Sequence, residues 1–230
     1  MRADDPDVFE VEGPPALEHP PERVIAALAP VVTPERLRRI QEVVEGRTDN
    51  LVVVLDRLSD PHNSSAVLRS ADAFGIQNVH AIVGRYGFRA SRGVSKGTHR
   101  WLDVIRYETA KACAKRLKED GYRIYVAVMN GDATPSDLCS VSRVAVVFGH
   151  EHRGVSPELR AEADGTFAIP LRGCVESLNV SVAAAITKQT LTTNGPPRLE
   201  PGRRRELLAR ILMNSVRNTR QIIEQSLGNE

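Results

Sequence analysis

The stretch Leu51-Val52-Val53-Val54-Leu55 (LVVVL, residues 51–55) decides the fold class. An uninterrupted run of aliphatic residues is typical of a strand buried on both faces, as the strands of a parallel sheet are. Similar runs follow at 79–83, 122–128, 144–148 and 167–169, and helical patterns lie between them at 64–74, 110–119, 157–163 and 177–191. Strands that alternate with helices predict an α/β fold, with a mainly parallel sheet flanked by helices.

Length and composition exclude several classes of protein. The chain has 230 residues, enough for one domain with appended segments. Hydrophobic residues make up 41% and charged residues 26%, which excludes wholesale disorder and collagen-like sequence. No apolar run approaches the ~18 residues that a membrane span needs, and the acidic N-terminus has no apolar stretch like that of a signal peptide. Three widely spaced cysteines without a CxxC motif favour a reduced compartment, so we expect a cytoplasmic protein.

The chain divides into three segments by composition. Residues 1–32 form an acidic, proline-rich N-terminal extension, in which Val24, Ile25 and Leu28 offer a short helical turn for docking. Residues 33–192 form the α/β domain with a leading helix, which begins with a capping hydroxyl at Thr33 and a proline at the next position. Residues 193–230 form a basic helical extension, whose apolar stripe needs a partner in this chain or in another subunit.

The net charge of +2 hides an asymmetry along the chain. Residues 1–22 carry seven acids and one base, so this segment is −6 and the remainder is +8. Bases gather at 85–106 and after 196, and neither set has enough acids near it in the sequence to neutralise it. Such excess is typical of a surface that binds a polyanion such as RNA, and equally of a solvated surface. The candidate RNA-binding residues are Arg85, Arg89, Arg92, Lys96, Arg100, Arg203, Arg204 and Arg205.

Ligands of parallel sheets bind beyond the carboxyl ends of the strands, and three loops at such positions are unusual. The first, at 60–70 (DPHNSSAVLRS), enters a helix near Asn63. Asn63 or Ser64 is a candidate N-cap, and the helix N-terminus is able to hold an anion. Arg69, six residues further on, is suited to grip a phosphate bidentately. The alternative is that Asn63 is only a cap and Arg69 only a surface residue.

The second loop, at 147–158, crowds His150, Glu151, His152 and Arg153 behind a glycine, Gly149, that permits a sharp turn. The HExxH zinc motif fails because residue 154 is glycine, so we expect no metal. The alternative for the carboxylate at 151 is an ion pair with the arginine at 153.

The third loop, at 169–186, leaves a strand at a proline and leads into a helix of small residues. Ser177 and Asn179 lie where that helix begins; alternatively, Ser177 only caps the helix and Asn179 is exposed. The sequence contains no GxGxxG, GxxxxGK[ST] or GxSxG motif, so hydride, phosphoryl and acyl transfer have little support.

Four segments in this order resemble the SpoU or TrmH branch of the SPOUT RNA 2′-O-ribose methyltransferases: DPHNSSAVLRSADAFG (60–75), SKGTHRWLDV (95–104), VVFGHEHRGVSPE (146–158) and IPLRGCVESLNVSVAAA (169–185). The resemblance covers residues 33–192, which it identifies as a methyltransferase domain. It implies a SPOUT fold with a C-terminal trefoil knot, S-adenosylmethionine as the cofactor and a homodimer as the active unit.

The resemblance also implies site residues. The cofactor pocket would be lined by Phe148, Gly149, Glu151, Ile169, Leu171, Ser177, Leu178 and Asn179. The catalytic set would be Arg69, Asn63, Glu151, Ser177 and Asn179. Because a guanidinium has a pKa above ~12 and is no base at neutral pH, we expect Arg69 to bind a substrate phosphate and orient the ribose hydroxyl.

The RNA substrate follows from the segments that flank the core. Many rRNA-directed members resemble this core but carry an RNA-binding domain at the N-terminus, for which residues 1–32 are too short and too acidic. A helix before the core (33–47) and an arginine-rich helix after it (202–224) resemble the plan of the tRNA guanosine 2′-O-methyltransferases, which act on a D-loop guanosine. The alternatives are an rRNA 2′-O-ribose methyltransferase and an RNA-binding SPOUT module without activity.

Overall fold

The structure is a computed structural model that describes residues 6–83 and 87–227. Two compact units are present: the first combines the segment up to residue 13 with residues 48–197, and the second combines residues 14–47 with the segment from 198 onward. This division differs from the segments expected from composition, because the helix over 34–45 belongs with the terminal helices rather than with the sheet.

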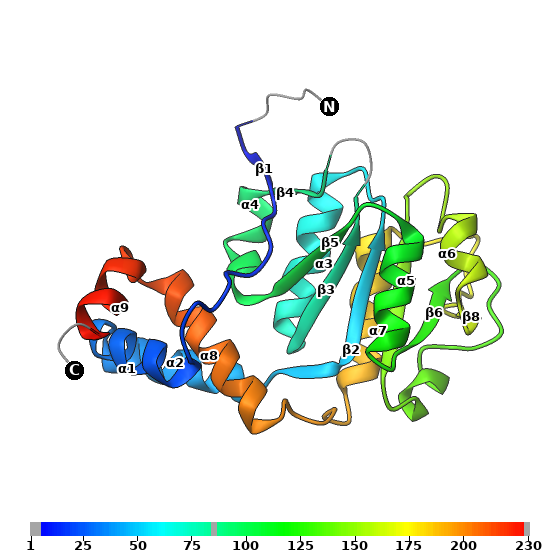
Figure 1. The fold of residues 1–230 in the computed structure, drawn as a ribbon. Helices are drawn as coiled ribbons and strands as arrows, with labels where there is room; N and C mark the ends of the chain where they lie inside the picture. Colours follow the sequence, from blue (N-terminus) through cyan, green and yellow to red (C-terminus); the bar gives the residue numbers. More distant parts are fainter. Residues whose placement is uncertain (1–5, 84–86, 228–230) are drawn as a thin grey trace. The chain divides into compact units, whose positions relative to one another are not determined.

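Within the described residues the first unit holds a six-stranded sheet in the order β5-β3-β2-β7-β6-β8 (Figure 1). All of its pairings are parallel, and at its centre Val53 aligns with Val79 on one side and Val146 on the other. The predicted α/β fold with a mainly parallel sheet is therefore confirmed. The strands are β2 (Thr48–Asp56), β3 (Ile76–Ile82), β5 (Asp103–Tyr107), β6 (Arg123–Ala127), β7 (Val144–Gly149) and β8 (Gly165–Phe167).

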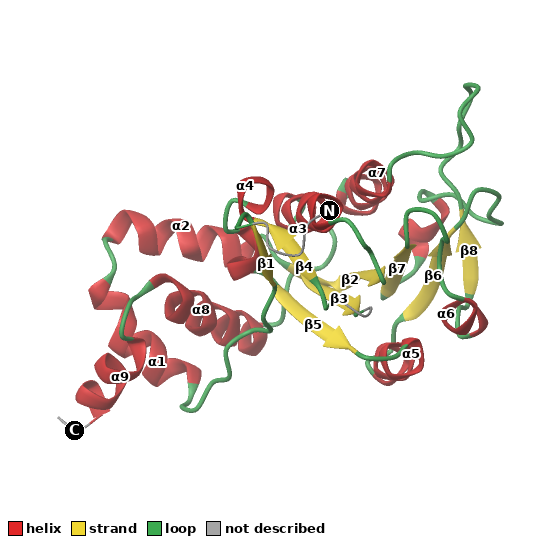
Figure 2. Ribbon diagram, turned by 90° about the horizontal axis from the view of Figure 1, so that it is seen from above, coloured by secondary structure: helices red, strands yellow, loops and turns green. Residues whose placement is uncertain are grey.

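Alternate residues of the central strand β2 face two different cores. Val53 and its neighbours on that face pack with α3 (Pro61–Ala73) and α7 (Val180–Thr192). Val52 and Val54 pack on the other face with α5 (Ala110–Glu119) and α6 (Pro157–Ala161). Figure 2 shows these two pairs of helices on opposite sides of the sheet. The LVVVL run is thus buried on both faces, as its composition predicts.

Two strands differ from the sequence prediction: one was expected at other residues, and one was not expected. The strand expected at 167–169 lies earlier, at Gly165–Phe167, because these residues pair with Tyr125, Val126 and Ala127 of β6. The strand β5 was not expected, because at the edge of the sheet it buries only part of its side chains and lacks a continuous apolar run.

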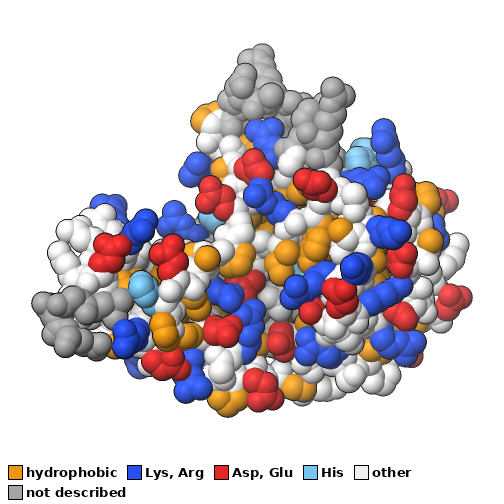
Figure 3. Space-filling model, viewed as in Figure 1, with side chains coloured by type: hydrophobic (Ala, Val, Ile, Leu, Met, Phe, Trp, Pro, Cys, Tyr) orange, Lys and Arg blue, Asp and Glu red, His pale blue; other side chains and the backbone are white. Residues whose placement is uncertain are grey.

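A second, two-stranded sheet joins the N-terminal segment to residues 87–106, which we call the basic stretch. β1 (Val8–Glu10) pairs antiparallel with β4 (Arg89–Ser91), which leads into the short helix α4 (Arg92–Ser95) and the 3-10 turn η2 (Thr98–Trp101). On the face shown in Figure 3, acidic and basic side chains are interspersed around these elements rather than separated. Arg85 lies outside the described residues.

The second unit is helical. It contains α1 (Pro21–Leu28), the 3-10 turn η1 (Ala29–Val31), α2 (Pro34–Glu45), α8 (Pro201–Ser215) and α9 (Thr219–Leu227). The apolar stripe of α8 packs on α1 and α2, so it finds its partner in this chain. This packing is also why α2 belongs to the helical unit. The buried side chains include Val24, Leu28, Ile40, Val44, Leu207, Ile211 and Leu212.

The leading helix α2 begins where the sequence predicts. Thr33 caps it, the hydroxyl accepting a hydrogen bond from the N–H of Arg36 at 3.3 Å. In the part of the chain that the structure describes, neither α2 nor any other helix combines the length and the apolar character needed to cross a membrane.

Candidate functional site

The candidate site lies at the carboxyl ends of β2 and β7. These strands are neighbours, but the chain leaves β2 toward β3 and leaves β7 toward the opposite edge of the sheet. A crevice at such a reversal of strand order is the usual ligand site of an open parallel sheet. The first and second loops start here, so the fold alone brings them together.

The carboxylate of Glu151, in the second loop, binds the first loop through four hydrogen bonds. Its Oε2 accepts from the backbone N–H and the hydroxyl of Ser59, at 3.3 and 3.0 Å. Its Oε1 accepts from the backbone N–H of Asp60 at 3.3 Å and from Nδ2 of Asn63 at 3.0 Å. The alternative ion pair with Arg153 is therefore wrong, since the carboxylate is directed at the first loop instead.

This hydrogen bonding controls the charge of the carboxylate. Burial alone would raise the pKa of Glu151, but the hydrogen bonds from Asn63, from the backbone and from Ser59 outweigh it and lower the pKa to about 2. Glu151 is thus ionised at neutral pH, an acceptor of hydrogen bonds and a weak base.

Asn63 connects the second loop to the third. Its amide donates to Glu151, and its Oδ1 accepts a hydrogen bond from Nδ2 of Asn179 at 3.1 Å. The Oδ1 of Asn179 in turn accepts from the backbone N–H and the hydroxyl of Ser181, at 2.8 and 2.6 Å. A continuous chain of hydrogen bonds therefore joins all three loops, and we call Glu151, Asn63 and Asn179 the loop network.

The helix caps differ from those expected. Asp60 caps α3, accepting from the N–H of His62 at 2.8 Å, so Asn63 lies in the first turn and its amide is available for the loop network. Asn179, not Ser177, caps α7, and it is exposed while also bonding Asn63. The alternative that Asn63 is only a cap is therefore wrong. The alternative for the third loop is right that Asn179 is exposed and wrong that Ser177 caps the helix.

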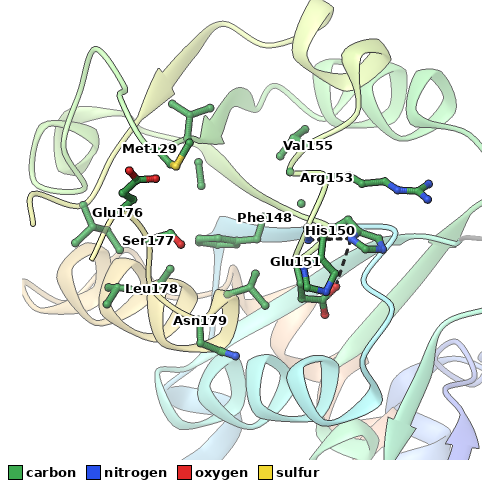
Figure 4. A pocket seen from close by; sticks show the side chains of 18 of the residues that line it. Met129, Phe148, His150, Glu151, Arg153, Val155, Glu176, Ser177, Leu178 and Asn179 are labelled. Atoms are coloured by element: carbon green, nitrogen blue, oxygen red, sulfur yellow. Dashed lines mark hydrogen bonds and ion pairs between the residues drawn. The ribbon is translucent and has the colours of Figure 1, made fainter. Parts of the chain in front are cut away.

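A pocket of about 780 Å³ opens beside the loop network (Figure 4). In that view the ring of Phe148 lies between Ser177 and Glu151. The structure brings together in this pocket all eight residues of the predicted cofactor set: Phe148, Gly149, Glu151, Ile169, Leu171, Ser177, Leu178 and Asn179.

Sequence reasoning missed part of the lining. Val128, Met129 and Asn130, which follow β6, line the pocket, as do Glu176, Val180 and Ala183. Residues 128–130 could have been predicted from their position, because the loop after β6 leaves the same edge of the sheet as the loops after β2 and β7. It carries no unusual polar cluster, so it did not stand out.

Gly149 is required by the turn at the end of β7. A Cβ on this residue would lie 2.2 Å from the backbone carbon of Gly154. The crowding arises because His150 and Gly154 exchange two backbone hydrogen bonds, at 3.0 and 2.8 Å, which fold the loop back on itself. Only a glycine fits, and the turn aims the next residue but one, Glu151, at the first loop.

Arg69 is not among the residues that line the pocket. It lies on α3, one and a half turns beyond Asn63, with its side chain exposed. Among the described residues, no hydrogen bond or ion pair engages its guanidinium. The residue next to it does have a partner: Ser70 accepts a hydrogen bond from the fully buried Lys188 of α7, at 2.6 Å.

The candidate RNA-binding arginines of α8 have carboxylate partners, so the expectation that acids are lacking near them is wrong. Arg203 pairs with Glu206 at 2.8 Å, Arg204 with Glu45 at 2.5 Å and Arg205 with Glu22 at 3.4 Å. Two of these acids are distant in the sequence and reach α8 only through the fold.

The remaining candidates lie around β4. Arg89 is in β4, Arg92 begins α4, Lys96 follows α4 in a left-handed conformation (φ 46°), and Arg100 is in η2. In the described ranges, 6–83 and 87–227, no three His, Cys, Asp or Glu side chains gather as a metal site would require.

Comparisons with known proteins agree with this geometry. A model of the SpoU rRNA Methylase family matches residues 50–188, a range that contains all three loops and the whole pocket. The tRNA (guanosine(18)-2′-O)-methyltransferase of Thermus thermophilus is 37% identical over 193 residues, covering 80% of this chain and 97% of the relative. The enzyme of the same name from Escherichia coli K12 is 33% identical over 156 residues, covering 67% of this chain and 68% of the relative.

A solved structure is similar over nearly the same length. The crystal structure of the Aquifex aeolicus TrmH/SpoU tRNA modifying enzyme superposes with a TM-score of 0.71 at 26% sequence identity. The match covers 79% of this chain and 97% of that one.

Proposed function

The chain belongs to the SpoU methylase family, and from this premise we propose that it transfers a methyl group from S-adenosylmethionine to the ribose 2′-hydroxyl of a D-loop guanosine in tRNA. The relatives named for guanosine 18 of tRNA support that choice of substrate. The C-terminal trefoil knot of the SPOUT fold and a location in the cytoplasm, where tRNA is modified, are parts of the same proposal.

The loop network carries the proposal. Glu151, Asn63 and Asn179 come from three loops that are far apart in the sequence, and their hydrogen bonds fix these loops around one pocket. A polar network that is fully satisfied in this way holds its members in one geometry. Such a network is expected where a small molecule must be positioned for reaction.

The pocket fits S-adenosylmethionine by size and by the chemistry of its lining. Its volume of about 780 Å³ lies within the ~300–1,000 Å³ of small-molecule sites. Phe148, Leu171 and Leu178 offer apolar surface suited to an adenine ring, and Ser177 and Asn179 offer polar groups beside it. When bound, the cofactor supplies a methyl group on an electrophilic sulfonium.

Arg69 would act on the RNA rather than on the cofactor. The ribose oxygen must lose its proton as it takes the methyl group, but a guanidinium stays protonated at neutral pH. Glu151, with a pKa of about 2, is too weak a base for this proton. We therefore assign to Arg69 the binding of a substrate phosphate and the orientation of the hydroxyl, while that phosphate or another group accepts the proton.

The homodimer belongs to the proposal because α7 has an apolar face without a described partner. Val182 and Ile186, one turn apart on α7, are 46% and 39% exposed, and Val175 in the preceding loop is 62% exposed. Apolar side chains grouped in this way mark an interaction surface. A second copy of the chain covering α7 would bring its own residues to the edge of the pocket.

RNA binding by the basic residues is a further part of the proposal. The set around β4 (Arg89, Arg92, Lys96, Arg100), with Arg85, and the set on α8 (Arg203, Arg204, Arg205) would contact RNA phosphates. In this proposal the sheet unit within residues 33–192 carries out methyl transfer, and residues 193–230 assist in holding the RNA.

The test is methyl transfer from labelled S-adenosylmethionine to unmodified RNA by the purified chain. With tRNA transcripts we expect stoichiometric incorporation that nuclease mapping places on the ribose of one D-loop guanosine. Incorporation into ribosomal RNA alone would replace the tRNA proposal with the rRNA alternative. Cofactor binding by calorimetry addresses the other alternative: a module without activity would show no binding at millimolar S-adenosylmethionine.

A further inference from the structure

The acidic N-terminal segment lies on the basic stretch that follows the first loop. β1 pairs with β4 in the register Val8–Ser91 and Glu10–Arg89, and backbone hydrogen bonds extend the pairing at both ends. The N–H of Arg92 donates to the carbonyl of Asp7 at 2.7 Å, and the N–H of Val11 donates to the carbonyl of Phe88 at 3.0 Å. Five consecutive residues, 7–11, are therefore held along the basic stretch.

Side chains of this segment occupy the hydrogen-bond donors of the basic stretch. The carboxylate of Asp7 accepts from the hydroxyl of Ser91 and from the backbone N–H of Gly93, the latter at 2.9 Å. The hydrogen bonds from Ser91 and from the Gly93 backbone lower the pKa of Asp7, so it is an anion at neutral pH. Glu10 pairs with Arg106 on the neighbouring edge strand β5.

An aromatic contact adds to these ionic ones. The ring of Phe9 lies 5.1 Å from the guanidinium carbon of Arg92 and 4.6 Å, centre to centre, from the ring of His99. Anions that alternate with a planar ring along an extended chain resemble the phosphates and bases of a single-stranded RNA segment. The basic stretch thus holds, from its own chain, two carboxylates and one aromatic ring.

This surface is attached to the helix that carries Asn63 and Arg69. The hydroxyl of Ser65 on α3 accepts a hydrogen bond from the N–H of Ser91 at 2.7 Å and donates to the Ser91 carbonyl at 3.2 Å. A hydroxyl and a backbone N–H that bind a carboxylate, with arginines beside them, are equally suited to a phosphodiester oxygen.

We propose that Ser91, Arg92, Gly93 and Arg106 form a binding site for RNA backbone phosphates, and that residues 7–11 occupy it as an internal RNA mimic that the substrate must displace. The proposal rests on the proposed function, since it takes RNA as the ligand. It accounts for an acidic segment in a chain whose remaining residues carry a net charge of +8.

The first experiment compares tRNA binding by two double variants of the full chain. Asp7→Asn with Glu10→Gln removes the two carboxylates that occupy the site. Glu12→Gln with Glu18→Gln removes the same charge from exposed positions of the same N-terminal region. At low salt we expect the first variant to bind tRNA about three- to tenfold more tightly than the parent, because the competing segment loses its charged contacts with the site.

The outcomes separate occupation of the site from simple charge repulsion. We expect the Glu12/Glu18 variant to gain less than twofold. Equal gains in both variants, or none in the first, would overturn the proposal.

Hydrogen exchange tests the displacement itself. With saturating tRNA, the amides of Phe9 and Val11, which face β4 in this antiparallel pair, should exchange at least tenfold faster than in the free protein, because the strand loses its bonds to β4. Unchanged or increased protection of these amides would overturn the displacement.

The parent chain separates this proposal from the proposed function. If the parent neither binds nor methylates any RNA, the proposed function fails. If it methylates tRNA while both tests above are negative, only the internal mimic is wrong.

Discussion

The first turn of α3 and the middle of the same helix differ in how their polar side chains are used. Asn63 is 9% exposed and is engaged on both sides by Glu151 and Asn179. Arg69, six residues further on, is exposed, and in the described part of the chain its guanidinium has no bonded partner. Polar groups that pair inside the protein build the pocket, and a cation left unpaired on the same helix as Asn63 is available to a substrate.

Removing the unpaired cation should have the largest effect. We expect Arg69→Ala to lower turnover of tRNA by about 10²–10⁴-fold, the range for loss of one positioned catalytic group. Arg69→Lys should recover only part of this, because an ammonium keeps the charge but lacks the bidentate fork. Single-turnover methylation measures both.

Cofactor binding is the control for this pair of variants. Calorimetry should give both of them the affinity of the parent for S-adenosylmethionine, since Arg69 does not line the pocket. Near-normal turnover of Arg69→Ala would remove this residue from the mechanism, and a matching loss of cofactor affinity would place it in the pocket after all.

Replacing Glu151, a hydrogen-bonded member of the loop network, should weaken cofactor binding. Glu151→Gln keeps the shape of the side chain. It replaces the charged carboxylate, which accepts four hydrogen bonds, by a neutral amide. Because a hydrogen bond to a charged group contributes ~1.5–3 kcal/mol, we expect S-adenosylmethionine to bind about 10- to 100-fold more weakly. Glu158→Gln, an exposed carboxylate seven residues away, should leave the affinity unchanged. If the two variants bind alike, the loop network is not what holds the pocket.

Lys188, a buried amine on α7, contrasts with the exposed Arg69 on the neighbouring helix α3. Its Nζ donates to the carbonyl of Val67 at 2.8 Å and to the hydroxyl of Ser70 at 2.6 Å, on either side of Arg69 in sequence. Burial lowers the pKa of Lys188 from 10.5 to about 7. Between these values the unfolded chain binds a proton that the folded chain does not, so stability rises with pH across this window.

The test is urea unfolding at pH 7.5 and 8.5. Relative to Lys188→Met, the parent should gain about 1.4 kcal/mol per pH unit, the slope for one proton. Parallel stability curves for the two proteins would show that Lys188 stays charged when folded.

The smallest effect is expected from the paired arginines of α8. Since Arg203, Arg204 and Arg205 already have carboxylate partners, their joint replacement by alanine should weaken tRNA binding only several-fold. The slope of log affinity against log salt should fall by ~0.7–0.9 for each of these arginines that binds a phosphate in the parent. An unchanged slope with altered subunit association in sedimentation runs would assign these residues to packing.

The sequence predicts the sheet, and the place where the loops meet, because both depend on short-range patterns, whereas the residues of the pocket were implied by the resemblance to the SpoU or TrmH branch. The LVVVL run specifies a doubly buried strand, and the carboxyl ends of such strands specify where the loops meet. The sequence does not predict the hydrogen bonds within the loop network, since Glu151 has an equally plausible partner in Arg153, two residues away. Only the turn that Gly149 permits directs the carboxylate to the first loop.

Charge pairing was predicted least well, for a related reason. Counting charges along the chain cannot reveal that Glu45 reaches Arg204 or that Glu10 reaches Arg106. Those pairs arise from helix packing and strand pairing between distant segments. Local composition therefore overstated how much basic surface is free of acids.

Methyl transfer to a tRNA with a single altered ribose shows whether the 2′-oxygen of the D-loop guanosine accepts the methyl group. The transcript is prepared twice, once with an ordinary ribose and once with a 2′-deoxyribose at the guanosine that mapping identifies, and each is offered to the parent chain with S-adenosylmethionine. We expect one methyl group per molecule on the first transcript and none on the second, with equal binding of both. Equal incorporation into the two transcripts would contradict this expectation, because the methyl group would then not be on that 2′-oxygen.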